Sequence, residues 1–344
     1  MKSFTYLVLI CVQVFVHSAV LNEEELSLQK WTSFKIQHGK EYEAEEEDKR
    51  RMKIFLDNER KIAEHNELYE KGEVTYKQGI NKFSDLTNEE FAELYLTDFG
   101  NDQNVIEEFP IANNFSLEEY QEPPPSKNWL KEGFVSPVKQ QGTCGSCWAF
   151  ATVGAIEAHV AIKTRNKKFR ILSEQNLVDC VKEAHGCHGG FMADAYNYVK
   201  RNKGIAFNKF YRYKGEQGRC RYKKNQRGAS IQGYKRISQG DEEEMKNVIG
   251  TVGPVSVGIA RGDLIQSYHS GIYRKSNCKP TRYTSHALLI VGYGTESNAR
   301  GEMDYWLVKN SWGPDWGSNG YIKIARNENT CGIASSAEYP IGVR

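Results

Sequence analysis

The stretch Gln141-Gly-Thr-Cys-Gly-Ser-Cys-Trp-Ala-Phe150 joins a glycine-rich turn to the start of a long apolar run. The run continues to Ile162 and is apolar on nearly all sides, which predicts a buried helix that begins at Ser146 or Cys147. A thiolate at a helix N-terminus is stabilised by the helix dipole and by free N–H groups, which lower its pKa from about 8.5. Cys147 is therefore a candidate nucleophile.

Two other interpretations of this stretch are open from the residues alone. Cys144 and Cys147 fit the Cys-x-x-Cys spacing of a redox pair or of a disulfide half. A zinc site is less favoured, because no second Cys-x-x-Cys follows at metal-ligand spacing, and we expect neither a metal nor a cofactor. Of the eight cysteines, Cys11 lies in an N-terminal segment that we expect to be removed, and the remaining seven are an odd number. In a secreted protein an odd count predicts one free thiol or an intermolecular bridge.

Residues 1–18 predict a secretory signal peptide. Lys2 precedes an apolar run over residues 6–16, and the small residues Ser18 and Ala19 follow it. The run is shorter than the roughly 20 apolar residues that a transmembrane helix needs, and no other segment predicts a membrane span. We therefore expect a protein of the secretory pathway, and we do not expect it to bind nucleic acid.

Charge divides the remaining chain into an acidic part and a basic part. Residues 19–122 hold 12 Lys and Arg against 26 Asp and Glu, whereas residues 123–344 hold 33 against 18. We expect the two parts to attract each other, and we expect acid to weaken that attraction. Residues 200–227 hold eleven basic residues and one acidic residue, Glu216. This stretch predicts either a solvated basic face or a docking surface for a polyanion or for the acidic part.

The acidic part has the pattern of a helical domain with a solvated charged face. Leu28, Trp31 and Phe34 stand at helical spacing. A second set of six residues falls within an arc of roughly 100° on one helix. These six are Glu47, Arg51, Phe55, Asn58, Ile62 and Asn66.

The segment after this helix predicts a strand, a second helix and a linker. Gly79-Ile-Asn-Lys-Phe-Ser-Asp85 alternates and predicts a short strand. Thr87 and Glu90 then predict a capping box at the start of a helix. Residues 98–128 lack periodicity and contain a proline triplet, which predicts an extended linker. The linker carries an N-glycosylation sequon at Asn114.

The basic part changes its pattern midway and predicts an α+β fold. Beyond the helix at Cys147, we expect one helix that begins at Ser173 and another over residues 192–199. Short strands bounded by glycines are predicted over residues 255–259, 286–291, 305–308 and 321–325. A helical lobe would then precede an antiparallel β lobe, and the cleft between them is the expected site.

Several motifs together resemble those of the papain-like cysteine proteases. The stretch around Cys147 resembles the family's active-site motif, in which the second cysteine is the nucleophile. Ser285-His-Ala-Leu-Leu-Ile-Val-Gly-Tyr-Gly294 and Tyr305-Trp-Leu-Val-Lys-Asn-Ser-Trp-Gly313 resemble its histidine and asparagine segments. The six-residue set and Gly79-x-Asn-x-Phe-x-Asp85 resemble the paired propeptide signatures of the cathepsin L-like subfamily. The resemblance covers nearly all of residues 28–340.

The resemblance implies a papain-like two-lobed α+β fold that is preceded by a helical inhibitory propeptide. We expect a signal peptide over residues 1–18, an inhibitory propeptide over residues 19–122 and a peptidase domain over residues 123–344. The propeptide tail would lie along the active-site cleft in the non-cleavable direction. The protein would then be an acid-activated zymogen of the lysosome or the cell exterior.

The resemblance also implies a role for each residue of the site. Cys147 would attack the peptide carbonyl, His286 would shuttle the proton, and Asn310 would orient His286. Gln141 and the backbone N–H of Cys147 would stabilise the oxyanion, and Trp312 would shield the bond between His286 and Asn310 from water. The implied disulfides are Cys144 with Cys187, Cys180 with Cys220, and Cys278 with Cys331.

Substrate recognition is inferred from the same resemblance. One group of residues is expected to hold the substrate or to line the pocket for the side chain two residues before the scissile bond (P2). They are Gly189, Gly190, Phe191, Met192, Gly258, Thr284, Ala287, Ser336 and Trp312. Because none is a carboxylate, we expect apolar or aromatic P2 side chains and little preference for arginine. The resemblance implies endopeptidase activity on proteins and peptides, cystatin-type inhibitors as partners, and a monomer.

Ser285 departs from the family pattern, which usually has aspartate or asparagine before the histidine. The lack of a charge here removes one electrostatic support for the imidazolium. The main alternative to an enzyme is a non-catalytic binding protein that keeps the fold. A redox protein with a bridge between Cys144 and Cys147 is the third possibility.

Overall fold

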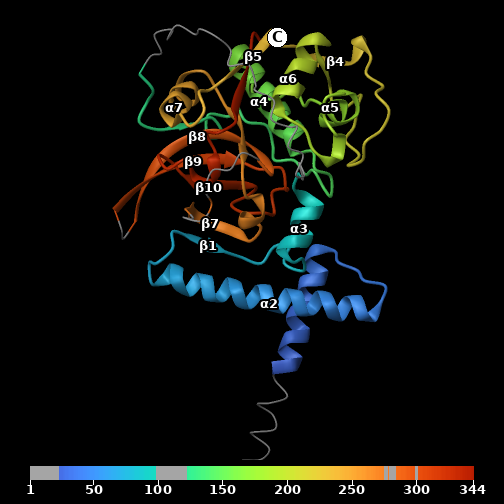
Figure 1. The fold of residues 1–344 in the computed structure, drawn as a ribbon, viewed down its shortest axis with the longest axis vertical. Helices are drawn as coiled ribbons and strands as arrows, with labels where there is room; N and C mark the ends of the chain where they lie inside the picture. Colours follow the sequence, from blue (N-terminus) through green and yellow to red (C-terminus); the bar gives the residue numbers. More distant parts are fainter. Residues whose placement is uncertain (1–22, 98–121, 275–277, 279–283, 299–300) are drawn as a thin grey trace, which may run out of the picture.

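The computed structural model describes residues 23–97, 122–274, 278, 284–298 and 301–344 (Figure 1). The predicted signal peptide and the sequon at Asn114 lie outside these residues. The described chain forms two lobes and an N-terminal arm beneath them, and we define the arm as residues 23–97. Among the described helices, none is both long enough and apolar enough to cross a membrane.

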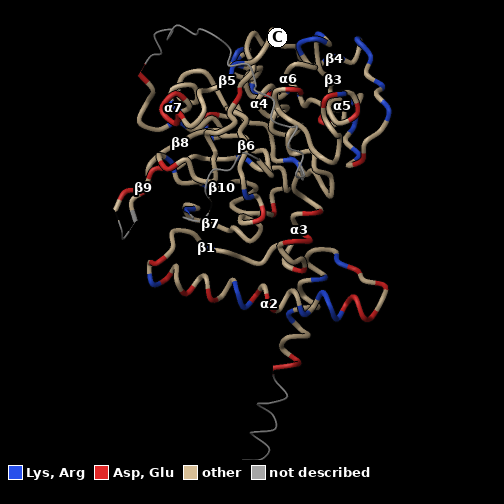
Figure 2. The backbone as a smooth tube through the Cα atoms, in the orientation of Figure 1, with Lys and Arg blue, Asp and Glu red and all other residues tan. Residues whose placement is uncertain are grey.

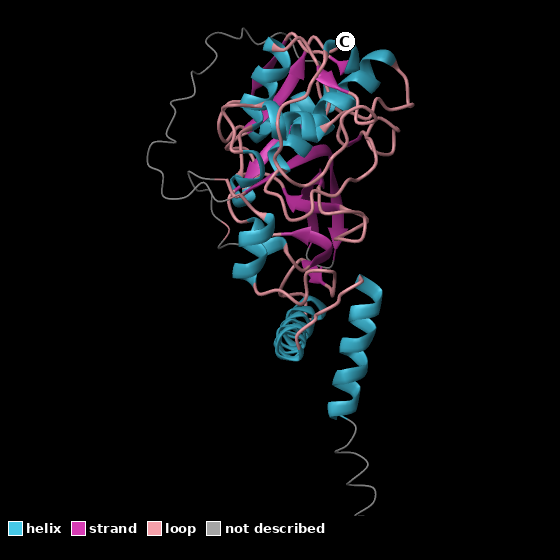
Figure 3. Cartoon of the chain, turned by 90° about the vertical axis from the view of Figure 1, so that its right-hand side faces the viewer, coloured by secondary structure: helices cyan, strands magenta, loops and turns pink. Residues whose placement is uncertain are grey.

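The arm consists of three helices and one strand. They are a helix over residues 23–38, α2 (Glu45–Glu70), β1 (Tyr76–Gln78) and α3 (Asn88–Tyr95). The first two helices cross, and Figure 3 shows α2 end-on. Trp31 and Phe34 of the first helix pack against Phe55 of α2, forming a small core that is separate from the core of the lobes. The apolar spacing read from the sequence therefore gives the arm a core of its own.

The start of α3 is the capping box that the sequence predicts. The Thr87 hydroxyl accepts the Glu90 N–H, and the Glu90 carboxylate accepts the Thr87 N–H. In the next turn Phe91 is fully buried. The helix thus has a fixed start and a buried face, and it leads the chain into contact with the lobes.

The strand predicted over residues 79–85 is wrong, because these residues form a turn. Asn81 Oδ1 accepts the Phe83 N–H at 2.9 Å, and the Ser84 hydroxyl accepts the Asn81 N–H at 3.0 Å. Short polar side chains of this kind compete with neighbouring strands for the backbone donors. The strand of the arm instead lies earlier in the chain, at β1.

The first lobe is helical and is built on α4 (Cys147–Thr164), which begins where the sequence predicts. Every side chain from Cys147 to Ala161 is buried, as expected for a helix that is apolar on nearly all sides. The rest of the lobe comprises α5 (Glu174–Cys180), α6 (Met192–Arg201), β3 (Ile205–Ala206) and β4 (Arg227–Ala229). Ser173 caps α5 by accepting the Asn176 N–H, and α6 begins at the predicted residue.

The second lobe is a β-sheet against which α7 (Glu242–Thr251) packs. Its strands are β2 (Lys127–Asn128), β5 (Gly233–Arg236), β6 (Val255–Ile259), β7 (Tyr268–Tyr273), β8 (His286–Asn298), β9 (Gly301–Lys309), β10 (Tyr321–Ala325) and β11 (Ala337–Ile341). Short 3-10 turns are η2 (Gly186–His188), η3 (Lys224–Gln226), η4 (Gly262–Ile265) and η5 (Thr330–Gly332). The four predicted strands are present, and β8 and β9 run longer than predicted.

The order of the sheet is β1-β7-β10-β9-β8-β6-β11-β5, with β2 also paired to β8. The arm therefore adds its one strand to an edge of the second lobe. Neighbouring strands in the described sheet are antiparallel except for β7 and β10, which run parallel. The expectation of a wholly antiparallel lobe is corrected at that pair.

The basic stretch of residues 200–227 follows the outer side of the helical lobe, where Figure 2 shows lysines and arginines along the surface. The body of the arm lies at the other end of the molecule, where β1 pairs with β7. The arm therefore docks elsewhere than on the basic stretch.

A buried charged cluster joins the two lobes. Lys139 Nζ lies 2.8 Å from Glu157 Oε1 of α4 and 2.5 Å from Glu174 Oε1 of α5. Lys309, the last residue of β9, donates to Ser136 O at 2.8 Å, and the Ser136 hydroxyl donates to Glu157 Oε2 at 2.5 Å. Both carboxylates are buried. The cluster ties the central helix of one lobe to a central strand of the other.

Candidate active site

Cys147 lies in the first turn of α4 and is the one free cysteine among the described residues. The other described cysteines form the disulfides Cys144–Cys187, Cys180–Cys220 and Cys278–Cys331. This is the pairing that the resemblance implies, and it excludes the bridge between Cys144 and Cys147 that a redox protein would need. The thiol is buried, and its sulfur lies 3.4 Å from the hydroxyl of Thr97 in the arm.

His286 is the first residue of β8, and Asn310 directly follows β9. His286 Nε2 and Asn310 Oδ1 are 2.8 Å apart, and the Trp312 ring stacks on the imidazole with a centroid separation of 4.5 Å. Asn310 Oδ1 also accepts the Ser311 N–H at 2.7 Å, which turns the amide oxygen toward the imidazole. Nε2 therefore carries the proton, and Nδ1 has no hydrogen-bond partner among the described residues. Trp312 thus lies directly beside His286.

The two lobes bring the thiol and the start of β8 together. The backbone N–H of Ala287, the residue after His286, favours the thiolate form of Cys147. The N–H groups of Trp148 and of Cys147 itself also favour the thiolate. The N–H groups of Cys147 and Trp148 are the free donors that the start of a helix provides.

Burial in the proenzyme nevertheless favours the neutral form of both groups. Desolvation raises the pKa of the Cys147 thiol above its usual value, although the Thr97 hydroxyl and the backbone donors partly offset this. Desolvation also lowers the pKa of His286 to about 4, although the hydrogen bond to Asn310 favours the cation. In this state the site holds a thiol and an imidazole rather than an ion pair.

Gln141 lies six residues before Cys147 and has a fully buried side chain. Its Oε1 accepts the Ser311 hydroxyl at 2.6 Å, which fixes the orientation of the amide. Its Nε2 donates to Cys144 O at 2.9 Å and to Tyr95 O of the arm at 3.1 Å. The amide is thus held by the protein and already donates to a carbonyl oxygen from a chain in the cleft.

The end of the arm contacts residues to which the sequence assigns a catalytic role, and their neighbours. The Thr97 N–H donates to Ser285 O at 2.9 Å, while its hydroxyl contacts Cys147. Phe91 of α3 packs edge-on against Trp312 with a centroid separation of 5.0 Å. The sulfur therefore faces a side-chain hydroxyl of the arm.

Four residues predicted for the P2 pocket meet around Gly258 of β6. Gly258 pairs with Ala287 of β8 on one side, and on the other its N–H donates to Ser336 O at 2.9 Å. A Cβ at Gly258 would lie 2.6 Å from Thr284 Cγ2. A larger residue would therefore displace Thr284, which accounts for the glycine.

The backbone before α6 requires the two glycines of the predicted substrate loop. Gly189 has a φ of 131°, which side-chain-bearing residues rarely adopt. A Cβ at Gly190 would lie 2.7 Å from the ring of Trp148. Phe191 and Met192 follow at the start of α6, which packs against β11 and β5. The loop thereby brings both side chains to the boundary between the lobes.

The sequence reasoning missed a carboxylate next to this pocket. Glu338 lies two residues after Ser336 on β11, is 1% exposed, and pairs with Arg236 of β5 at 3.1 Å. Alternate residues of a strand share a face, so the spacing of residues 336 and 338 is the signal that reveals it.

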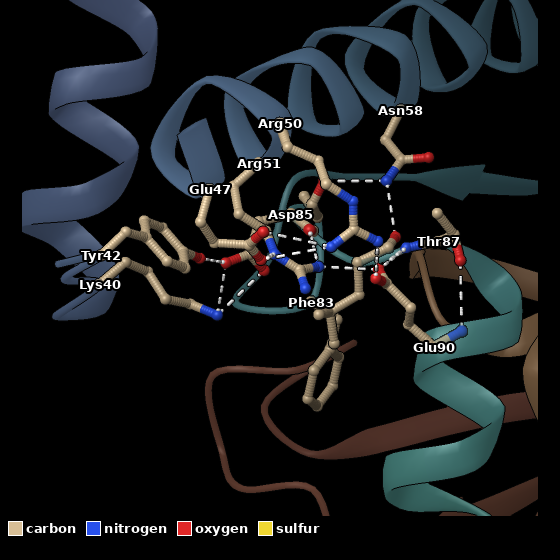
Figure 4. A network of polar contacts seen from close by, with 12 residues as sticks. Lys40, Tyr42, Glu47, Arg50, Arg51, Asn58, Phe83, Asp85, Thr87 and Glu90 are labelled. Carbon is tan, nitrogen blue, oxygen red and sulfur yellow. Dashed lines mark hydrogen bonds and ion pairs between the residues drawn. The ribbon is translucent and has the colours of Figure 1, made fainter. Parts of the chain in front are cut away.

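A network of charges fixes the fold of the arm (Figure 4). The Asp85 side chain is fully buried, accepts the Tyr42 hydroxyl and lies 2.8 Å from Lys40 Nζ. Arg51 of α2 donates to Glu90 Oε2 at 2.7 Å and to Asp85 O at 3.1 Å. The network thus joins α2 to the turn at residues 79–85 and to α3.

Two family models match the chain. Residues 123–341 match a model described as papain family cysteine protease. Residues 31–91 match a model described as cathepsin propeptide inhibitor domain. The two matches fall on the lobes and on the arm, respectively.

Individual relatives match over most of the chain. Cathepsin L of Sarcophaga peregrina is 43% identical over 325 residues, covering 92% of this chain and 93% of the relative. Cathepsin L2 of Homo sapiens is 41% identical, covering 90% of this chain and 91% of the relative. A solved structure, digestive procathepsin L2 proteinase from the larval midgut of Tenebrio molitor, matches with a TM-score of 0.83 and 40% identity. That match covers 92% of this chain and 99% of the solved chain.

Proposed function

This chain belongs to the papain family of cysteine proteases, as a cathepsin L-like endopeptidase made as a proenzyme, and we propose that Cys147, His286 and Asn310 form its catalytic site. The observation that carries this proposal is the 2.8 Å contact between His286 Nε2 and Asn310 Oδ1 next to the one free thiol of the described chain. Gln141 supplies the oxyanion donor, because its Nε2 already donates to a carbonyl oxygen of the arm.

The reaction follows from these positions once the arm has left the cleft. His286 takes the proton of Cys147 at Nδ1, giving a thiolate and an imidazolium whose Nε2–H stays bound to Asn310. The sulfur forms a bond to the substrate carbonyl carbon, and the oxyanion accepts hydrogen bonds from Gln141 Nε2 and the Cys147 N–H. The C–N bond breaks as the imidazolium protonates the departing amine. His286 then deprotonates water, which attacks the thioester, releases the acid and restores the thiol.

Titration with a thiol-reactive epoxide tests the site. We expect the activated protein to bind one equivalent at Cys147 and to lose hydrolysis completely. Cys147→Ala removes both labelling and activity, whereas Glu183→Gln, at an exposed position, changes neither. A folded, activated protein that neither reacts nor hydrolyses peptides would instead support a non-catalytic binding protein.

The proposal includes removal of residues 19–122 on maturation, leaving a peptidase of residues 123–344. The match to the peptidase model begins at residue 123, and β2 (Lys127–Asn128) is already paired with β8. Because a proline after the scissile bond is a poor substrate, we expect the cut within a few residues of Pro123 rather than directly before it. N-terminal sequencing of the activated protein checks this, and a first residue beyond Lys127 contradicts it.

Activation by acid is supported by the network of the arm. Burial raises the pKa of Glu90, but hydrogen bonds from the Thr87 N–H and from Arg51 outweigh this and leave it below its usual value. A carboxyl with a lowered pKa stabilises the fold above its unfolded pKa, and this contribution is lost as the pH falls through the folded pKa. Acid therefore loosens the arm and exposes the cleft.

Substrate preference and location complete the proposal. The P2 pocket takes apolar or aromatic side chains, because Met192 and Ala287 present buried apolar surface there. Relatives from Homarus americanus are named digestive cysteine proteinases, which supports passage through the secretory pathway to the lysosome or the cell exterior. We expect glycosylation at Asn114, a monomer, and inhibition by cystatin-type proteins as well as by the propeptide.

A further inference from the structure

Two cross-strand residue pairs between β6 and the β11 segment lie on the same face of the sheet. One pair belongs to the predicted P2 pocket, and the other is polar and lies next to it. Gly258 and Ser336 form the first pair. Ser256 pairs with Glu338 one step further along, and alternate residues of paired strands point to the same face. The intervening pair, formed by Val257 and Ala337, faces the core on the other side. The Glu338 carboxylate thus lies on the same face of the sheet as Gly258 and Ser336, the residues predicted to line the P2 pocket.

Only one oxygen of this carboxylate is used by the protein. Glu338 Oε1 accepts from Arg236 Nε and Nη2, both at 3.1 Å, and lies 3.5 Å from the Ser336 hydroxyl. Glu338 Oε2 is buried and has no hydrogen-bond partner among the described residues. A buried acceptor without a partner costs free energy, and a ligand that donates to it recovers that cost.

The nearby hydroxyl groups do not supply the missing donor. Ser256 Oγ donates to Glu338 O at 2.8 Å, so its proton is already used. Tyr196 of α6 lies 2.9 Å from Ser256 Oγ and therefore donates to that oxygen. These two hydroxyl groups are thus committed to other acceptors.

The pair of Glu338 and Arg236 selects the chemistry of the missing donor. Arg236 Nη2 already lies 3.1 Å from Glu338 Oε1, so a second cation in this place would face the guanidinium at close range. A neutral hydroxyl at the end of a long side chain brings a donor without that repulsion. Among P2 residues of the expected aromatic class, tyrosine carries such a group.

We propose that Glu338 is a specificity-determining residue that gives the pocket a preference for tyrosine over phenylalanine at P2. This inference rests on the proposed function, because it assumes that the pocket beside Gly258 receives the P2 side chain. The apolar preference of the pocket is thereby joined by one polar contact, which the hydroxyl at the end of a P2 tyrosine makes with Glu338.

Peptides that differ only at P2 test the inference on the activated wild-type protein. We compare phenylalanine, tyrosine, 4-methoxyphenylalanine and arginine through kcat/KM. A hydrogen bond to a carboxylate predicts about a tenfold advantage of tyrosine over phenylalanine. The methoxy analogue keeps the oxygen but has no donor, so it does not exceed phenylalanine, and arginine stays below phenylalanine.

Variants then assign the effect to Glu338. Glu338→Met brings the ratio of tyrosine to phenylalanine to about one, whereas Glu183→Met, at an exposed ion-paired position, leaves the ratio unchanged. If Glu338→Met does not fold, the methoxy comparison in the wild type still decides the question. Equal rates for tyrosine and phenylalanine, or a tyrosine advantage that survives Glu338→Met, overturn the inference. Hydrolysis of none of the four peptides contradicts the proposed function itself, and the inference falls with it.

Discussion

At the scale of single residues, burial under the arm decides the charge of Cys147 and His286. The pKa of the thiol is raised and that of the imidazole is lowered by the same desolvation, so the arm holds both in their neutral forms. The inhibited state is therefore blocked chemically as well as sterically, because a thiol is a far weaker nucleophile than a thiolate.

Alkylation of Cys147 by iodoacetamide measures this directly. In the full-length proenzyme we expect the rate to be negligible at pH 5 and to rise only at alkaline pH, because the raised pKa keeps the thiol protonated. After activation the rate at pH 5 should be at least about a hundredfold higher, because exposure removes the desolvation cost of the thiolate. Mass spectrometry of the labelled peptide reads both rates, and identical pH profiles before and after activation would contradict this account.

Ser285, the residue before His286, is expected to affect the pH dependence of activity. Ser285 is uncharged, and its hydroxyl accepts the Gly262 N–H at 2.9 Å. Ser285→Asp adds a negative charge near the imidazolium, so the alkaline limb of kcat/KM should move up by about one pH unit. Ser285→Asn changes the shape without the charge and serves as the control. An alkaline limb that does not move in the aspartate variant rejects the electrostatic role of this position.

At the scale of elements, the sequence predicted the helix starts near the motifs well, and it predicted the secondary structure between the motifs poorly. The start of α4, the cap of α5 and the capping box of α3 depend on local side chains that can be read in order. The strand expected over residues 79–85 failed because Asn81 and Ser84 bind the local backbone instead. The short strands β5, β7 and β11 owe their existence to partners far away in the sequence, so no local pattern marks them.

The residues of the candidate site were likewise predicted where they belong to a motif and missed where they do not. Cys147, His286, Asn310 and Gln141 were predicted because each belongs to a distinctive motif, and the structure brings them together. Glu338 was missed because it carries no motif, and its importance arises only from its place on a strand behind Ser336. The contacts of Tyr95 and Thr97 were missed for a related reason, since only the docking of the arm brings them to the cleft.

The cluster that joins α4 to β9 gives a prediction about stability. Lys139→Met removes the cation in direct contact with the buried carboxylates of Glu157 and Glu174, which should cost about 3–5 kcal/mol of unfolding free energy at pH 7. Desolvation already raises the pKa of Glu174 in spite of Lys139, so protonation should make the loss smaller at pH 4.5. Urea unfolding at the two pH values measures the difference, with the exposed Lys131→Met as the control. Equal losses in the two variants would show that the cluster does not stabilise the fold.

At the scale of the whole molecule, the opposite net charges of the two parts do not describe how they dock. Among the described residues, an ion pair between the arm and the lobes joins Lys82 of the acidic part to Asp315 of the basic part at 3.0 Å. Its polarity is the reverse of the net charges. Docking instead uses the strand β1, aromatic packing against Trp312 and the backbone contacts of Thr97.

We therefore expect acid to act on the folding of the arm more than on its attraction to the lobes. Glu90→Gln removes the charge that pairs with Arg51 at every pH, which should destabilise the arm by about 1.5 kcal/mol and make processing about tenfold faster at pH 5.5. Gel assays of processing over time measure the rate. Glu89→Gln, exposed on the same turn, is the matched control and should process like the wild type. Similar rates for both variants would place the acid trigger outside this network.

The hydroxyl of Thr97 against the sulfur of Cys147 has a consequence for the time course of maturation. In this state the sulfur contacts a side-chain hydroxyl of the arm, so we expect the first cut to come from another copy whose arm has already opened. Each copy that is released can then release others. We expect maturation to proceed as a chain reaction, with a lag that shortens at higher protein concentration and disappears when a trace of finished enzyme is added.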